Sequence, residues 1–393
     1  LKTGKLGYQP QYTRNMLQMN NHGQFFTETA LMSGVAATDW SWGPLFADYD
    51  QDGKIDLFIT NGIPKRPNDL DYVKFISNEQ IQKKLDQTTL VDNQALDLMP
   101  EGRVTNYFFR GKGNGMFEDD TKNWIKNDSI ISTGVAYGDL DNDGDQDLFV
   151  TFVWKPNKLY RNEGNGRFTD VTEETGLGGG KHVTHEAVWF DFDRDGLLDV
   201  CVANYGAWTD GASPLLGRDN QSGPPNQLFH HRMDGDKHVF EEVGVELGVD
   251  DRGWTHCVGV LDYDRDGWPD LFSMNDFGVS RVYRNREGKR FEEVSQKLGF
   301  NLLTNSMNFH LLDLDHTGRM SVYVTQIHKH TERIRYVQPT SKTTVRFERL
   351  GEMRALVDNM LFHPDDTGFY RDVHHIWVDP GNFGWAWDAS GFD

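Results

Sequence analysis

Asp262-Tyr-Asp264-Arg-Asp266-Gly267-Trp-Pro-Asp270-Leu271 is the clearest copy of a stretch that the chain repeats five times. Carboxylates stand at positions one, three, five and nine, and glycine at position six permits a sharp turn. A short loop with this spacing surrounds a hard cation with oxygen atoms, and calcium suits it best. The sequence therefore predicts four calcium sites, with these ligands: Asp48, Asp50, Asp52 and Asp56; Asp139, Asp141, Asp143 and Asp147; Asp191, Asp193, Asp195 and Asp199; Asp262, Asp264, Asp266 and Asp270.

A fifth copy begins at Asp313 and keeps only Asp315 as a second carboxylate, because Thr317 and Ser321 occupy positions five and nine. We expect it to bind calcium weakly or not at all. Acidic turns without any metal are the alternative for all five loops. That alternative is disfavoured because crowded carboxylates without a cation repel one another.

An EF-hand begins with similar spacing but needs a bidentate glutamate at position twelve and a helix on each side. Position twelve is Ile59, Val150, Val202 or Ser273 in the four complete loops. The residues after each loop, such as Leu57-Phe-Ile-Thr, are mostly β-branched or aromatic and favour a strand. Each loop is therefore expected to join two strands.

A second motif alternates with the loops and reads most fully from Asn157 to Val171, a strand, a Gly/Asn turn and another strand. Its other copies lie at 15–28, 106–119, 226–243, 280–294 and 359–373. One loop with its two strands and one hairpin make a four-stranded antiparallel unit, and tandem units of this kind are typical of a β-propeller. We predict an all-β propeller with five complete blades and one partial blade in this chain, and six or seven blades when closed.

The five loops begin 91, 52, 71 and 51 residues apart, so a bare blade takes about 51 residues and the longer intervals hold insertions. Residues 62–105 show helical spacing, with Asn68 or Asp69 as a cap of the first turn. Residues 205–225 are rich in Gly, Ser, Pro and Asp and are interpreted as a loop. We assign residues 1–393 to one propeller domain and expect Asp393 to open a sixth loop in a longer natural protein.

The net charge of −20 disfavours nucleic acid and anionic membranes as partners. No run of about 18 apolar residues suggests a membrane-spanning helix. Leu1-Lys-Thr-Gly lacks both a starting Met and a signal-peptide core, which indicates a processed or trimmed chain. Calcium loops of this weak kind work where calcium is millimolar, so an extracellular or cell-surface location is expected. Cys201 and Cys257 allow either one disulfide or two buried thiols.

The acidic loops and the hairpin Leu159-Tyr-Arg-Asn-Glu-Gly-Asn-Gly-Arg-Phe168 resemble the FG-GAP or VCBS repeats of integrin-α-type propellers. The chain is most similar to bacterial surface and secreted proteins related to cartilage acidic protein, and the resemblance covers nearly its whole length. It implies a calcium-binding β-propeller. It implies little about function, because this fold hosts adhesion modules, lectins and polysaccharide lyases.

In propellers of the resembled family, ligands commonly bind near the axis on the face opposite the acidic loops. We count back from each loop to the start of the inner strand and forward to the end of the next strand. Both positions should lie on the face opposite the loops. The residues there form a predicted ring of aromatic, imidazole and amide groups, which suits a sugar. The predicted ligand-binding residues are Trp42, Asn61, His185, Asn204, His256, Asn275 and Trp387. Lys181, His182, Arg252 and Trp254 would add positive charge and a further ring. Packing between blades remains the alternative for the two tryptophans, and a structural hydrogen bond for each histidine.

Motifs of phosphate-binding, serine hydrolase, zinc protease and haem sites are absent from the sequence. We therefore predict a binding module for a polysaccharide or an extracellular protein, and no catalytic residues. A calcium-dependent polysaccharide lyase of propeller fold stays open, with His185 or His256 as general base. A third possibility that stays open is a structural subunit of an extracellular assembly, which would dock to its partner through residues 62–105.

Overall fold

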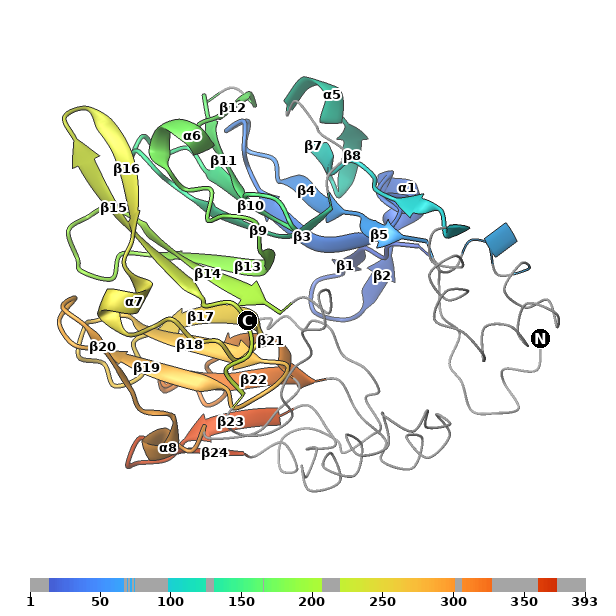
Figure 1. Ribbon diagram of the computed structural model, residues 1–393. Coiled ribbons are helices and arrows are strands. Elements are labelled where there is room, and N and C mark those ends of the chain that lie inside the picture. The colour runs from blue at the N-terminus through green and yellow to red at the C-terminus, as the bar shows by residue number, and fades with distance from the viewer. Residues whose placement is uncertain are drawn as a thin grey trace, which may run out of the picture. The chain divides into compact units, whose positions relative to one another are not determined.

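The computed structural model describes residues 14–66, 69, 71–72, 74, 98–124, 131–164, 166–206, 220–300, 306–326 and 360–372 (Figure 1). These residues form five four-stranded antiparallel sheets, accompanied by helices that are single turns of four residues. The fold is an all-β propeller of four-stranded blades, as the sequence predicts. Residues 373–393, with Trp387 and Asp393, lie outside the described part, so the expected sixth loop lies outside it too.

The five sheets repeat one order of strands, from the strand before the acidic loop to the second strand of the hairpin. They consist of β3 (Ser41–Ala47), β4 (Asp56–Asn61), β7 (Tyr107–Gly113) and β8 (Met116–Asp119); β9 (Ser132–Gly138), β10 (Asp147–Phe152), β11 (Lys158–Asn162) and β12 (Phe168–Asp170); β13 (Val183–Phe190), β14 (Asp199–Tyr205), β15 (Gln227–Asp234) and β16 (Lys237–Glu242); β17 (Thr255–Leu261), β18 (Asp270–Asn275), β19 (Arg281–Asn285) and β20 (Phe291–Glu293); β21 (Ser306–Leu312), β22 (Ser321–Gln326), β23 (Met360–Pro364) and β24 (Tyr370–Asp372).

Single-turn helices stand next to the blades: α1 (Ala30–Ser33), α5 (Thr121–Trp124), α6 (Thr172–Thr175), α7 (Gly244–Leu247) and α8 (Ser295–Leu298). The hairpin of β1 (Gln18–Asn20) and β2 (Phe26–Glu28) leads into α1. A glycine in the left-handed conformation ends four of these turns, at Gly34, Gly176, Gly248 and Gly299. The sequence analysis does not anticipate these turns, because four residues are too few to show a helical period.

The chain divides into two compact units, one of Leu1–Val135 with Asn162–Thr169 and one of Ala136–Arg161 with Asp170–Asp393. The first unit contains loop one, residues 48–56. The second contains loops two to five, which begin at Asp139, Asp191, Asp262 and Asp313.

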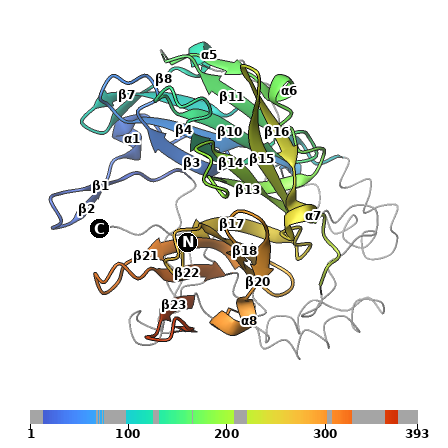
Figure 2. The same cartoon turned by 90° about the vertical axis from the view of Figure 1, so that its left-hand side faces the viewer.

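Within the second unit, the sheets pack face to face, with β17 in contact with β13 on one side and β21 on the other (Figures 1 and 2). One apolar cluster lies between sheets β13–β16 and β17–β20 and contains Cys201, Val258 and Leu271. Another lies between β17–β20 and β21–β24 and contains Phe272 and Val322. Because both faces are covered in this way, every residue of β18 is buried, and its sequence does not alternate between polar and apolar.

The described ends of the first insertion pair through β5 (Ile63–Lys65) and β6 (Glu101–Gly102). The Asp69 carboxylate accepts hydrogen bonds from the backbone N–H groups of Asp71 and Tyr72, the contacts that an N-terminal cap makes. In the second insertion, residues 207–219 lie outside the described part.

Cys201 and Cys257 are both free thiols and both buried. Of the two alternatives left open by the sequence, the structure therefore shows two buried thiols. In the described part of the chain, no helix has the length and apolar character needed to cross a membrane.

Candidate metal loops and a histidine cluster

In the four complete loops, the carboxylates at positions one, three and nine converge, with one oxygen of each within 4.8 Å of the others. The residues are Asp48, Asp50 and Asp56; Asp139, Asp141 and Asp147; Asp191, Asp193 and Asp199; and Asp262, Asp264 and Asp270. The carboxylates converge because the four loops adopt the same backbone conformation. The residue at position four has φ between 55° and 63°, and the glycine at position six has φ between 81° and 95°.

The first carboxylate of each loop holds the turn through the backbone. In loop four, Asp262 accepts hydrogen bonds from the N–H groups of Asp266 at 3.0 Å and Gly267 at 2.9 Å. The fifth-position carboxylates also accept local bonds, as Asp266 does from the N–H of Trp268 at 3.0 Å. In the described residues, the fifth-position carboxylates are not members of the groups formed by positions one, three and nine.

The ninth carboxylate ties the loop to the third strand of the blade and is buried. Asp270 accepts hydrogen bonds from the N–H of Tyr263 at 3.1 Å and from the N–H of Asn285, on β19, at 2.8 Å. Burial raises the pKa of this carboxyl to about 7, and it raises that of Asp56 to about 6 and that of Asp199 to about 8. A cation beside these carboxylates would favour their ionised form.

Two third-position oxygens test whether the loops suit a hard cation. Asp50 Oδ1 and Asp141 Oδ1 are buried and accept no hydrogen bond, and the Asp50 side chain is only 7% exposed. A buried carboxylate oxygen without a partner is costly, and oxygen ligands of this kind are those that calcium takes. The donor set in these loops therefore fits the predicted ion.

A cluster of histidine and aromatic side chains lies at the strand ends opposite the acidic loops, in the second unit. The ring centroids of His185 and His256 are 4.2 Å apart, and that of Tyr205 is 4.7 Å from His185. Tyr205 Oη donates a hydrogen bond of 2.6 Å to Asp276 Oδ2. The sequence analysis placed His185 and His256 on one face of the propeller, and the structure brings them into contact.

Both histidines stand at β-bulges. The register of β13 with β14 shifts between Thr184 and Glu186, and that of β17 with β18 shifts between Thr255 and Cys257, so His185 and His256 each occupy the extra position of a bulge. A bulge turns the side chain out of the regular alternation, which is why it is common beside binding sites. Sequence periodicity does not reveal a bulge, since one extra residue in a strand leaves no change of composition.

Burial lowers the pKa of both imidazoles. For His185 the pKa lies well below its ordinary value, with a further contribution from His256. For His256 the lowering is opposed by the Asp276 carboxylate and by a hydrogen bond to the Met307 backbone. At neutral pH the cluster therefore holds two neutral imidazoles beside a protonated phenol, because burial also raises the Tyr205 pKa.

The asparagines predicted for the ligand ring are completely buried. Asn204 Nδ2 donates to Pro225 O at 2.8 Å, and Asn275 Nδ2 donates to Val279 O at 2.8 Å. Asn61 Nδ2, in the first unit, donates to Thr105 O at 3.2 Å. In each of these three blades the amide ties the end of the second strand to the segment that enters the third strand.

The predicted aromatic residues differ in exposure. Trp254, named as a further ring, is fully buried and donates its Nε1–H to Ser222 Oγ at 3.0 Å. Its ring lies edge-on to Tyr205 at 5.2 Å, so it supports the cluster from within. Trp42, in the first unit, is 37% exposed and donates its Nε1–H to Gly62 O at 2.7 Å.

A family model described as "FG-GAP-like repeat" matches residues 95–150, 139–202 and 262–324. The chain carries FG-GAP-like repeats folded as a β-propeller. The matched stretches contain loops two to five, whereas loop one, residues 48–56, lies outside them.

Two relatives are similar to parts of this chain. Cartilage acidic protein 1 of Xenopus tropicalis is 32% identical over 164 residues, which are 42% of this chain and 22% of that protein. Cartilage acidic protein 1 of Mus musculus is 24% identical over 200 residues, 39% of this chain and 31% of that protein. The chain thus covers less than a third of the length of either relative.

Among solved structures, the V. cholerae biofilm matrix protein Bap1 is similar at a TM-score of 0.36 and 13% identity, over 84% of this chain and 39% of that one. The chain titled BBS1N, in complex with ARL6DN, is similar at 0.34 and 8% identity, over 74% and 76%.

The fifth FG-GAP-type loop keeps the backbone of the others without their carboxylates. Asp313 accepts hydrogen bonds from Thr317 N at 3.0 Å and Gly318 N at 2.9 Å. Ser321, at position nine, contacts His363 Nδ1 at 2.8 Å. In the described residues, Asp313 and Asp315 belong to no group of three possible metal ligands. Weak or absent binding at this loop remains the expectation.

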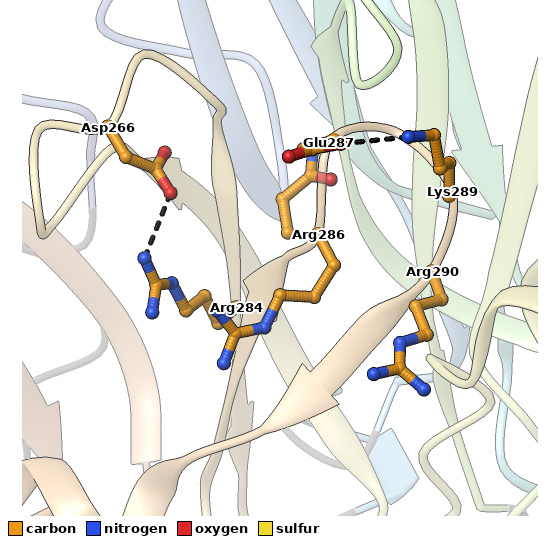
Figure 3. Close-up of a pocket in the computed structure, with 7 residues that line it drawn as sticks. Asp266, Arg284, Arg286, Glu287, Lys289 and Arg290 are labelled. Atoms are coloured by element: carbon orange, nitrogen blue, oxygen red, sulfur yellow. Dashed lines mark hydrogen bonds and ion pairs between the residues drawn. The ribbon is translucent and has the colours of Figure 1, made fainter.

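A basic side chain on the third strand of the repeat contacts the third-position carboxylate, and the sequence analysis missed it. Arg110 lies 2.9 Å from Asp50, Arg284 lies 2.6 Å from Asp264, and His230 lies 3.0 Å from Asp193. Figure 3 shows Arg284 reaching towards Asp266, beside a depression of about 490 Å³. The sequence signal that could have revealed this contact is the arginine that recurs in Leu159-Tyr-Arg161-Asn162 and Val282-Tyr-Arg284-Asn285.

Proposed function

We propose that this chain is a calcium-stabilised binding module that works outside the cell and recognises a polysaccharide or an extracellular protein. The observation that supports it is the convergence of three carboxylates in each of four loops, two of which present a buried oxygen without a hydrogen-bond partner. Calcium is the proposed ion because every donor in these groups is a carboxylate oxygen. We also keep the proposal that residues 1–393 belong to one propeller domain.

The proposed role of calcium is structural. Each ion would neutralise a group of carboxylates and pin the first two strands of a blade to its third strand through the ninth aspartate. At ten times its dissociation constant, one ion contributes about 1.4 kcal/mol to the free energy of unfolding. Four such sites together would form a large part of the stability of a marginally stable chain.

The extracellular location follows from the calcium proposal. Loops of this kind in extracellular modules bind calcium with dissociation constants on the order of 10⁻⁴ to 10⁻³ M. They would be loaded outside a cell and largely empty inside one. The similarity to cartilage acidic protein 1 supports the same proposal.

We propose the cluster of His185, Tyr205 and His256 as the ligand-contacting surface of the second unit. Neutral imidazoles and a phenol combine hydrogen-bonding atoms with ring faces, which suits the hydroxyl groups and C–H faces of a sugar. Trp42 remains a proposed contact in the first unit. Because the described asparagines are buried and internally bonded, we assign Asn61, Asn204 and Asn275 to support of the strand ends.

The test is a melting experiment joined to a binding panel. Excess EGTA should lower the melting temperature of the full chain, and calcium, but not magnesium at the same concentration, should restore it. Calcium-loaded protein should then bind at least one neutral or anionic polysaccharide, and His185→Ala should weaken that binding while leaving the calcium-dependent melt in place. An unchanged melting temperature in EGTA would contradict the metal assignment. A lack of binding to every polysaccharide in the panel would favour a protein partner.

A calcium-dependent polysaccharide lyase is a second candidate, favoured by one observation. The cluster joins a neutral imidazole, His185, with the hydroxyl of Tyr205, and a neutral imidazole can abstract the proton α to a uronate carboxylate. Loss of the leaving sugar oxygen then creates an unsaturated product, and a hydroxyl group can protonate that oxygen. Unsaturated ends that form with wild type and not with His185→Ala would establish the lyase, whereas binding without cleavage would exclude it for the glycans tested.

A further inference from the structure

Loop three differs from its neighbours in the side chain that its third strand brings to the carboxylates. The backbone N–H of His231 bonds to Asp199 Oδ1 at 2.8 Å, as that of Asn285 bonds to Asp270 Oδ1 in loop four. His230 therefore holds the position that Arg284 holds one blade later. Arg110 holds the same position beside loop one, because Gly111 N bonds to Asp56 Oδ1 at 2.7 Å.

The His230 ring points into the loop. Its Nε2 lies 3.0 Å from Asp193 Oδ2, and ligand atoms of Asp193, Asp195 and His230 all lie within 4.8 Å of one another. The Nε2 atom is buried, yet its geometry does not satisfy a hydrogen bond. Phe192 packs against the ring at 5.2 Å, with the planes at 62°. The imidazole nitrogen thus lies at ion-pair distance from one carboxylate oxygen of the loop, while the side chain as a whole is 22% exposed.

The exchange of arginine for histidine changes what the loop can bind. A guanidinium is permanently charged and has no lone pair for a metal, so Arg110 and Arg284 can only neutralise their loops. A neutral imidazole supplies a nitrogen ligand instead. Calcium takes oxygen ligands, whereas a mixed set of imidazole and carboxylates suits zinc and other first-row transition ions.

We propose that loop three is a transition-metal site, in which a zinc-class ion is bound by His230 Nε2 and the carboxylates of Asp193 and Asp195. Asp193 also belongs to the group formed with Asp191 and Asp199, so zinc and calcium compete at this loop. Loops one and four, with arginine at the equivalent position, keep their preference for calcium. The zinc site does not depend on the polysaccharide or protein ligand proposed above.

The experiment measures zinc and cobalt binding to the full chain in millimolar calcium. Wild type should bind zinc by calorimetry, and Co²⁺ at the same site should give visible absorption bands that zinc removes. His230→Arg, which makes loop three resemble loop four, should lose one zinc equivalent and those bands. Arg284→His is the reciprocal variant and should gain one zinc equivalent at loop four.

The folding of both variants is checked by their melting curves, which should still depend on calcium. If His230→Arg does not fold, His230→Gln takes its place. Other histidines do not affect the result, because it rests on the difference between variants. A wild-type chain that binds no zinc in calcium, or a His230→Arg chain that binds as many equivalents as wild type, would overturn the proposal. A loss of zinc with an unchanged EGTA-sensitive melt separates this site from the calcium sites.

Discussion

Asp264 and Asp315 occupy the third position of two loops that share a backbone and differ in their carboxylates. Asp264 converges with Asp262 and Asp270, whereas in the described residues Asp315 joins no such group. We therefore expect Asp264→Ala to remove one calcium equivalent and, at ten times the dissociation constant, about 1.4 kcal/mol of stability. Asp315→Ala is the matched control and should change neither quantity. Calorimetric titration and calcium-loaded melts measure both, and equal losses in the two variants would contradict the assignment.

The two clustered histidines predict a dependence of stability on pH. Burial holds the folded-state pKa of His185 and His256 below that of an unfolded histidine. The unfolded chain therefore takes up more protons as the pH falls through about 6.5, and stability that is complete above this pH is lost below it. The slope is at most about 1.4 kcal/mol per pH unit for each imidazole.

The double variant His185→Gln/His256→Gln isolates this contribution, because glutamine keeps a polar group without a titration. Denaturant melts in calcium at pH 7 and pH 5 should show a smaller loss of stability in the variant than in wild type. His231, whose pKa burial lowers to about 4, should leave a remaining acid sensitivity in both proteins. Identical losses in variant and wild type would show that the pair is not held neutral.

At the scale of the element, β13 and β17, the first strands of two neighbouring blades, each carry a histidine of the cluster near one end and lead into an acidic loop at the other. β17 carries the bulged His256 at its second position and ends at Leu261, directly before Asp262, the first residue of loop four. The loop end was predictable because all its ligands lie within nine positions of the sequence. The bulged end was not, because the bulge depends on the pairing of Thr255 with Asn275 across the sheet.

The contact between neighbouring sheets in the second unit can be tested at Gly259 of β17. A Cβ at this position would lie 1.3 Å from Phe309 Cζ on β21, so Gly259→Ala must displace that ring. Overpacking of this kind typically costs about 1 to 3 kcal/mol. Gly178→Ala is the control, since its Cβ would meet Pro156 and Thr172 at ordinary distances of 3.5 and 3.6 Å. Urea melts in calcium should separate the two variants, and a neutral Gly259→Ala would contradict the packing of β17 against β21.

For the whole molecule, the two compact units differ in the number of complete loops that they hold. The first unit contains loop one, whereas the second contains loops two, three and four. If calcium stabilises each loop, chelation should weaken the second unit more than the first. Hydrogen exchange followed by mass spectrometry should show that EGTA accelerates amide exchange most in peptides covering residues 139–150, 191–202 and 262–273.

The internal control of that experiment is the peptide covering residues 313–321, whose exchange should not depend on calcium because the fifth loop lacks two carboxylates. Uniform acceleration over the described residues would indicate that the metal acts on the chain as a whole. No acceleration in the loops would remove the structural role proposed for calcium.

The sequence by itself determined the all-β propeller class and the four-stranded blade, and it predicted four carboxylate ligands in each complete loop, of which those at positions one, three and nine converge. These features are local: a loop closes within nine residues, and strand and turn signals recur in every repeat. The tertiary structure alone decided that His185 meets His256 and Tyr205, that the ring asparagines are buried, and that His230 enters loop three where arginine enters loops one and four. The physical reason is that those contacts depend on bulges, on strand register and on the stacking of neighbouring sheets, which join residues distant in the chain.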